Sequence, residues 1–178
     1  MLESRPASVG SRRGLKRGAL QILAAWQRLG QRPFGRWLFA RAVCWRAPYF
    51  ATIRPQFHEL SPGRCAVGLK RRRAVLNHQG GVHAIAIANL CELAAGVLME
   101  ATLPASHRWI PRGMTIEYLA RAESDVLATA RLDRSTWGAA ENVGVPVTVA
   151  DLAGRETVRA VISMYVSPRP AAASGSAG

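Results

Sequence analysis

The residues best suited to chemistry lie in the segment 77–83 and in the apolar stretch behind it. Glu92 is the only Asp, Glu, Lys or Arg between the glycines at 80–81 and Glu100. A carboxylate among apolar residues is costly to bury unless it is paired, and its pKa is commonly raised, which suits a general base or a nucleophile. We therefore expect Glu92 to be catalytic. The alternative is a structural ion pair with an arginine such as Arg112 or Arg121.

A long helix is predicted over 79–100, which contains no proline and would be about 33 Å long. The first turn of a helix carries free N–H groups and the positive end of the helix dipole. We expect Gly80, Gly81 and Val82 to hold a carbonyl oxygen there and to stabilise charge that develops on it.

Three polar side chains near this helix start have two candidate roles each. Asn77 is predicted to orient the substrate, or else to bond its own backbone in a turn. His83 is predicted to act in catalysis, or else to order the loop as a helix cap. Asn89 lies one turn before Glu92, and we expect it to hydrogen-bond that carboxylate or a water molecule.

The spacing of these residues resembles that of the hotdog-fold thioesterases of the phenylacetyl-CoA type, and especially an uncharacterised branch of them. His83 follows Asn77 by six residues and Glu92 follows it by fifteen, as in that family. The segment Gly113–Leu119 is similar to the strand that follows the family's helix. The resemblance covers about residues 48–167. It implies a hotdog fold and hydrolysis of an acyl-CoA, or a related carrier thioester, by Glu92, Asn77 and His83.

One part of the pattern differs, because the family's His-Gly-Gly is His83-Ala84-Ile85 here. Gly80-Gly81 would then have to supply the opening for the substrate. The alternative function is a hotdog module that binds an acyl thioester or a lipid without turnover. We expect no cofactor other than CoA as part of the substrate, and no metal.

A second copy of the chain is required if both ends of the motif are to meet one substrate. His83 and Glu92 are nine residues apart, which is roughly 14 Å and half a turn on one helix. They cannot reach the same carbon. We predict a homodimer, or a dimer of dimers, in which Glu92 of one chain faces the helix start of the other.

The basic run Lys70-Arg71-Arg72-Arg73 is a candidate site for the phosphates of CoA, since guanidinium groups match phosphate oxygens well. Arg112 and Arg121 are weaker candidates. The alternative for the run is a solvated strand end that protects an edge from aggregation. Trp109 and Tyr118 are expected to line the core.

The order of elements predicts an α+β fold. Short β-like stretches at 50–57 and 65–69 precede the helix, and four more follow it at 108–120, 125–136, 143–151 and 157–167. A run of strands with one apolar helix indicates an antiparallel sheet of about five or six strands wrapped around a central helix. Apolar on every side, that helix should be buried all round.

The N-terminal segment 1–47 is distinct in charge. Residues 1–48 hold ten Lys/Arg and one acid, while the whole chain carries a net charge of +13. After an arm at 1–13, basic amphipathic helices are predicted at 14–30 and 34–47. They could lie on an anionic membrane surface, or pack on the domain as a lid or oligomer contact. No recognition motif supports nucleic-acid binding.

The remaining expectations concern location and the C-terminus. Three cysteines form neither a disulfide framework nor a zinc site, which indicates a reducing compartment such as the cytoplasm, with peripheral membrane attachment as the alternative. The sequence contains no run of eighteen uncharged apolar residues, so no transmembrane helix is predicted. The hotdog domain is expected to end at 167, and the tail 168–178 to be disordered.

Overall fold

The structure, a computed structural model, describes residues 18–170. Its helices are α1 (Gly18–Leu29), α2 (Gly35–Arg46) and α3 (Ala84–Thr102), with short 3-10 turns η2 (Pro48–Ile53) and η3 (Arg73–Val75). Its strands are β1 (Gln56–Ser61), β2 (Arg64–Leu69), β3 (His107–Tyr118), β4 (Val126–Arg131), β5 (Glu141–Asp151) and β6 (Glu156–Pro168). All neighbouring strands are antiparallel, in the order β1-β2-β4-β5-β6-β3.

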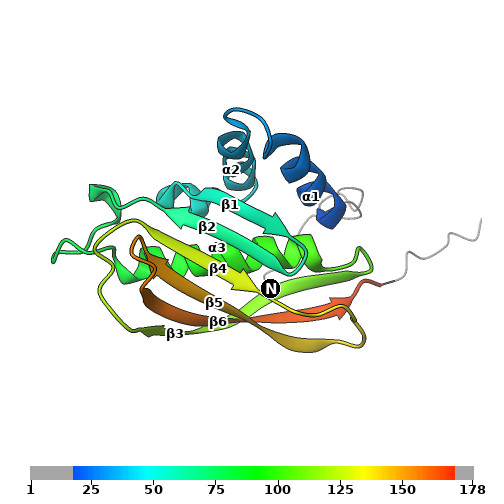
Figure 1. Cartoon of the computed structure of the whole chain (residues 1–178). Helices are drawn as coiled ribbons and strands as arrows, with labels where there is room; N and C mark the ends of the chain where they lie inside the picture. Colours follow the sequence, from blue (N-terminus) through cyan, green and yellow to red (C-terminus); the bar gives the residue numbers. More distant parts are fainter. Residues whose placement is uncertain (1–17, 171–178) are drawn as a thin grey trace, which may run out of the picture.

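The sheet curves around α3, which crosses behind it, while α1 and α2 lie beyond β1 at the opposite edge from β3 (Figure 1). This confirms the predicted α+β hotdog architecture of six strands around one central helix. Successive side chains of a strand point to opposite faces of the sheet, so every second residue faces α3. In β5 these are the buried residues from Val143 to Val149. These side chains pack against the buried face of α3 in one continuous core.

The long helix starts later than its sequence indicates. Residues 79–83 were expected to be helical, but Gly80 has a φ of +81° and the chain turns there before entering α3 at Ala84. The stretch 50–57 is not one strand. Pro48 starts the η2 turn, Arg54 ends it with a left-handed φ of 50°, and β1 begins only at Gln56.

The C-terminal boundary also differs. β6 extends to Pro168, and the Arg169 N–H donates to the Ser106 carbonyl at 2.7 Å, so residues 168–169 are part of the fold and not of a disordered tail. Residues 171–178 of the expected tail, the arm at 1–13 and residues 14–17 of the helix expected at 14–30 lie outside the described residues.

Within one chain, the central helix is not buried on all sides. A stripe with members every three or four residues is only partly covered. It comprises Ile85, Ala88, Glu92, Gly96 and Glu100. The C-terminal half of the stripe meets Trp109 of β3, whose Nε1 donates to Glu100 at 3.2 Å. The N-terminal half, where Ile85 is 61% exposed, has no such cover from the described residues.

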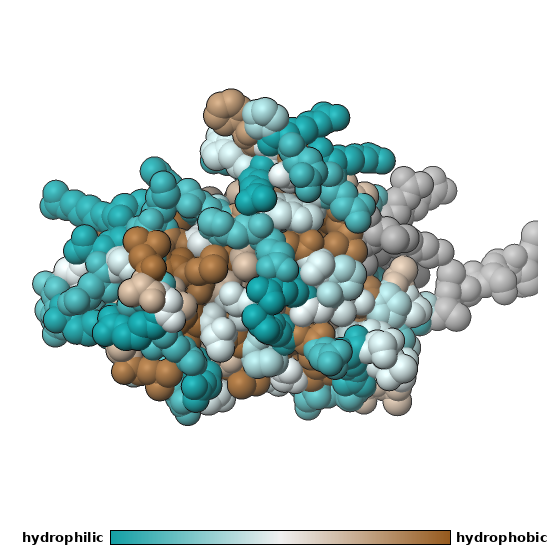
Figure 2. Space-filling view, in the orientation of Figure 1, coloured by the Kyte–Doolittle hydropathy of each residue, from teal (hydrophilic) through white to brown (hydrophobic). Residues whose placement is uncertain are grey.

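The two N-terminal helices are joined to the core through aromatic rings. Trp26 of α1 meets Phe39 of α2 at 5.2 Å between ring centroids, and Phe39 meets Phe57 of β1 at 5.0 Å, both edge to face. The outer side of this helical layer ends in an apolar tip among hydrophilic side chains, over the turn between α1 and α2 (Figure 2). α2 is therefore an integral layer of the fold and also presents a second, outward face.

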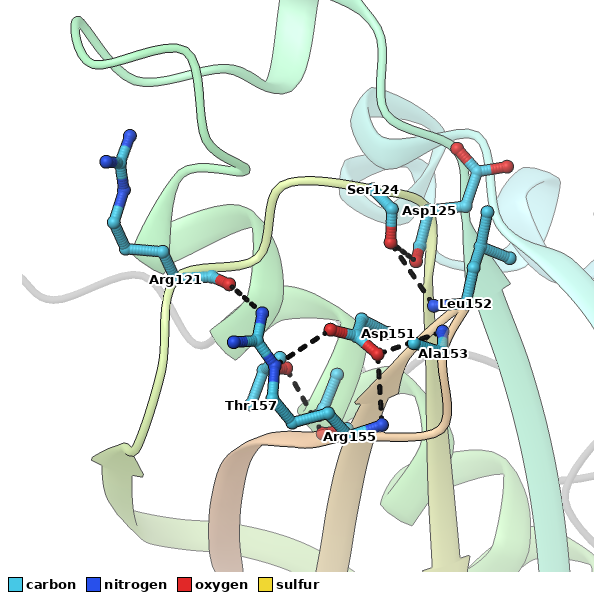
Figure 3. Close-up of polar contacts among 9 residues, drawn as sticks. Arg121, Ser124, Asp125, Asp151, Leu152, Ala153, Arg155 and Thr157 are labelled. Atoms are coloured by element: carbon cyan, nitrogen blue, oxygen red, sulfur yellow. Dashed lines mark hydrogen bonds and ion pairs between the residues drawn. The ribbon is translucent and has the colours of Figure 1, made fainter.

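A hydrogen-bond network at the β5–β6 turn holds the segment that follows β3 (Figure 3). Asp151 Oδ1 accepts from the N–H groups of Ala153 and Arg155, both at 3.0 Å. Arg155 Nε donates to Asp151 Oδ2 at 3.0 Å, and its Nη2 donates to the Arg121 carbonyl at 3.3 Å. Burial alone would raise the pKa of the Asp151 carboxyl, but the hydrogen bonds and charge of Arg155, with the Ala153 N–H, hold that pKa below its usual value.

Within residues 18–170, α3 alone is long and apolar enough to span a bilayer, and 61% of its apolar window is buried inside the domain. Its apolar character is explained by its place in the core.

Leu98 lies at the centre of the core with no exposed surface, so Leu98→Ala should leave a cavity beneath the sheet. We expect a loss of about 2–5 kcal/mol in the free energy of unfolding, measured by urea denaturation. Leu152→Ala is the matched control, since Leu152 is 77% exposed and should change stability by no more than about 0.5 kcal/mol. Equal losses in the two variants would contradict the described core.

The lowered pKa of Asp151 makes stability depend on pH. A carboxyl with a depressed pKa in the folded state contributes stability above its unfolded pKa of about 3.9, and this contribution is lost as the pH falls through the folded value. We expect Asp151→Asn to be less stable at neutral pH and to lose less stability on acidification. Thermal unfolding from neutral to acidic pH measures both. Asp133→Asn is the control: Asp133 is exposed and makes no ion pair among the described residues, so this variant should unfold at the parental temperature at neutral pH.

Candidate functional site

The segment before α3 forms a closed turn around Asn77. Asn77 Oδ1 accepts from the N–H groups of Gln79 at 3.0 Å and Gly81 at 3.1 Å, and the Asn77 N–H donates to the Gly81 carbonyl at 2.9 Å. Gly80 takes the left-handed conformation that this turn needs, where a side chain would be strained. Asn77 thus has the turn-forming role considered for it, and it also lines the cavity described below.

Two arginines bracket this turn from outside. Arg71 donates to the Gly80 carbonyl through Nη2 at 2.7 Å and Nε at 3.2 Å. Arg121 Nη2 donates to the Gln79 carbonyl at 3.0 Å. Because Arg121 is itself held through its carbonyl by Arg155, the β5–β6 turn indirectly supports the start of α3.

His83 is the N-cap of α3: its Nδ1 accepts from the Ile85 N–H at 3.1 Å. The ring is otherwise exposed, so capping is the role that the geometry shows for it.

The N–H groups expected to form an oxyanion hole are already used. Gly80 donates to the Asn77 carbonyl at 3.1 Å, Gly81 donates to Asn77 Oδ1, and Val82 donates to the Ala122 carbonyl at 2.8 Å. In the part of the chain that the structure describes, the open N–H groups at this helix start are those of Ala84 and Ala86. The donor position therefore moves from 80–82 into the first turn of α3.

A cavity of about 360 Å³ opens at this first turn. The helix start forms one wall, and the end of β3 with the segment after it forms the other. Its lining comprises Asn77, Gly81, Val82, Ala84, Ile87, Tyr118, Ala120, Arg121 and Ala122. The Ala84 N–H, an open donor at a helix N-terminus, thus belongs to a residue of the cavity wall.

Tyr118 was expected in the core, but it is 47% exposed and lines the cavity. Its hydroxyl donates to the Ala84 carbonyl at 3.2 Å, and partial burial, with a smaller effect of Cys91, raises the pKa of the phenol. The alternation of Met114, Ile116 and Tyr118 along β3 is the sequence signal that could have located it, since Tyr118 continues their face past the end of the core.

Glu92 lies on the partly covered stripe of α3 and does not line this cavity. It is eight residues beyond Ala84, about 12 Å along the helix axis. The alternative of a structural ion pair is not seen among the described residues: Arg121 pairs with Glu123 at 3.4 Å, and Arg112 stacks over the Tyr165 ring at 4.4 Å.

Asn89 does not support Glu92 as expected. Its Nδ2 donates to Thr52 Oγ1 of η2 at 3.3 Å, and its Oδ1 is buried without a hydrogen-bond partner in the described chain. The side chain faces η2 because Asn89 lies on the buried side of α3.

The four side chains of the basic run 70–73 do not form one cluster but make different contacts. Arg71 holds Gly80, and Arg72 Nη2 donates to the Thr52 carbonyl at 2.6 Å. Lys70 is exposed beside Asp125 in a separate pocket of about 190 Å³, and Arg73 is exposed at the start of η3. Of the four, Arg71 is tied most directly to the candidate site.

Comparisons with known proteins agree with this fold. A structural-genomics crystal structure shares 46% identity and a TM-score of 0.74, covering 85% of this chain and all of the other. A thioesterase family protein from Silicibacter pomeroyi shares 18% identity (TM-score 0.62, covering 73% and 96%). The PaaI protein from the phenylacetic acid degradation operon of E. coli shares 11% identity (TM-score 0.58, covering 73% and 97%). No curated protein sequence matches significantly.

The predicted resemblance to hotdog-fold thioesterases is thus confirmed at the level of the fold. The sequence family described as a domain of unknown function, DUF4442, matches residues 35–166, which include α2 and all of the sheet except the last two residues of β6. The chain belongs to the DUF4442 family and has the hotdog fold of its thioesterase neighbours.

Proposed function

We propose that this protein hydrolyses an acyl-CoA, or a related carrier thioester, at a site completed by a second copy of the chain. The observation that carries the proposal is the separation of two complementary groups. Open N–H donors at the start of α3 adjoin a cavity, and the carboxylate of Glu92 lies about 12 Å away on a stripe that its own chain leaves partly uncovered.

The stripe and β3 supply a surface on which a second copy could pair. β3 is a twelve-residue edge strand, and Ile110 near its start is 56% exposed. Pairing two such edges across a twofold axis would extend the sheet and bring the two α3 helices together antiparallel. Glu92 of each copy would then approach the first turn of the other's α3.

The chemistry follows from these positions. The thioester carbonyl oxygen would accept a hydrogen bond from the Ala84 N–H. Because this N–H lies at the positive end of the helix dipole, it would stabilise the negative charge that develops on that oxygen. Glu92 of the other copy would take a proton from water as the oxygen attacks the carbonyl carbon. The carbon–sulfur bond then breaks, and the thiolate leaves and receives that proton.

The phosphates of CoA would bind at the mouth of the cavity. Arg121 lines the cavity, and Arg71 borders it through its bonds to Gly80. Both side chains are exposed, so each guanidinium group could also donate to a phosphate oxygen. Lys70, Arg72 and Arg73 would add positive charge along the same chain segment.

A second candidate is a module that binds an acyl thioester or a lipid without turnover. One observation favours it: Ile85, where the thioesterase pattern has glycine, projects from the first turn of α3 and is 61% exposed. Such a side chain could hold an acyl group while it blocks the approach of water.

Glu92→Gln tests the carboxylate. Loss of the base should lower kcat in a thiol-release assay over acyl-CoAs of several chain lengths by about 10²–10⁴-fold. Glu100→Gln, on the same stripe, retains an acceptor for Trp109 and should keep parental activity. The buried Cys65 and Cys91, whose thiol pKa values are raised by burial, should add little background. Tight binding of acyl-CoA without turnover by the parent chain would favour the binding module.

A mixed-chain experiment tests the shared site. Asn77→Asp keeps the acceptor of the turn but adds negative charge beside the developing oxyanion, so it should inactivate its own cavity. A heterodimer of Asn77→Asp and Glu92→Gln chains would contain one intact site and one doubly altered site. We expect about half of the parental activity from differently tagged, co-purified chains. If both residues served one site within a chain, the mixture would be as inactive as its components.

A further inference from the structure

We propose that the outward face of α2 docks this protein on anionic lipid bilayers. α2 has two apolar faces. Gly35, Phe39, Ala40 and Cys44 are buried against the domain, while other large side chains project outward. Phe34 is 84% exposed, Leu38 48% and Trp45 86%. At about 100° per residue, Leu38 and Trp45 fall within one narrow sector opposite the buried face, and Phe34 is the N-cap residue that precedes the helix.

The residue that precedes this face, Phe34, has a strained backbone conformation. Phe34 is one of two non-glycine residues in the described chain with a positive φ, at 60°, and the other is Arg54 at 50°. A bulky side chain rarely adopts this conformation, and strain of this kind tends to occur where it serves a function. In the described chain Phe34 gains no burial in return for the strained backbone.

Positive charge surrounds the apolar sector without compensation. No acidic residue occurs between Glu3 and Glu59, and the described part of that interval carries six arginines. They are Arg28, Arg32, Arg36, Arg41, Arg46 and Arg54. None of the six makes an ion pair within residues 18–170. An anionic surface is the partner that such a field attracts.

A hollow beside this sector suits a phosphate group. The cavity is about 430 Å³ and is walled by α2 on one side and by η2 and the start of β1 on the other. Arg41 and Arg54 both line it, together with Trp37, which is 61% exposed and stacks with Arg41 at 5.9 Å. Arginine binds phosphate oxygens strongly, so a lipid headgroup fits here while the apolar side chains enter the interface.

The shape of the face favours a bilayer over a nucleic acid. Single strands bind in grooves where bases stack on aromatic platforms, whereas Leu38 and Trp45 project from the convex side of α2 and Phe34 is exposed at its N-cap. Exposed tryptophan on an arginine-rich helix is typical of proteins that lie in the membrane interface. α2 borders β1, so docking through it leaves β3 and the stripe of α3 free, and the inference does not rest on the proposed function.

The full chain should be used in the test, because Phe39 of α2 belongs to the core and truncation would damage the fold. We expect flotation with vesicles containing phosphatidylglycerol, little with phosphatidylcholine alone, and weaker binding as salt increases. Trp45→Ser and Leu38→Ser should each weaken binding to the vesicles at least about tenfold. Burial of one such side chain in the bilayer contributes a free energy that corresponds to this change in affinity or a larger one. Leu152→Ser, on an exposed turn away from α2, should bind like the parent.

The charge and the depth of insertion have their own variants. Arg41→Gln should weaken binding to anionic vesicles, while Arg131→Gln, at an exposed strand end, should not. Brominated lipids should quench the parent's tryptophan fluorescence, and less so that of Trp45→Phe, which keeps an apolar side chain and should still bind. The absence of vesicle binding, binding unaffected by Trp45→Ser and Leu38→Ser, or retention on DNA alone that depends on the same side chains would overturn the proposal.

Discussion

The partial enclosure of α3 is the constraint on which the rest of the structure depends. One curved sheet takes up the buried face of the helix and leaves a stripe along the other side incompletely covered. Enclosure fixes the direction of the helix, so that its first turn meets the end of β3 and forms a cavity there. The same constraint makes Glu92 tolerable in an apolar helix, because the residue lies at the margin of the core and not within it.

The candidate site is rigid where donors are needed. Asn77 satisfies the turn from inside, Arg71 and Arg121 hold it from outside, and Asp151 with Arg155 supports Arg121 in turn. Such a chain of hydrogen bonds preorganises the N–H groups at the helix start, and preorganised dipoles are the most effective way to stabilise a developing charge. The carboxylate, by contrast, is placed by the helix alone.

Much of the fold could be predicted from sequence because its signals are local. Alternation in β5 and β6, the proline-free stretch before Glu100 and the glycine turns located the elements to within a few residues. The errors arose where individual side-chain hydrogen bonds decide the local structure. Gly80 and Gly81 turn outside the helix because Arg71 and Asn77 hold them there, and the amide of Asn89 is drawn to Thr52, thirty-seven residues away. Alternation along β3 indicates which face Tyr118 shares with Met114 and Ile116, but its place in the cavity wall also depends on where β3 ends relative to α3.

The two edges of the sheet are unlike, and this difference limits growth. Both edge strands carry a bulge, β1 between Phe57 and Glu59 and β3 between Pro111 and Gly113, but β1 is short and is bordered by α2. β3 is twice as long, and its outer edge is bare within the described residues. A sheet with one bare edge can be extended only once, because after two bare edges join each end of the larger sheet is a protected β1. Edge-to-edge association of this protein would thus stop at a pair of chains. A sheet with two bare edges could instead keep adding copies and form fibres.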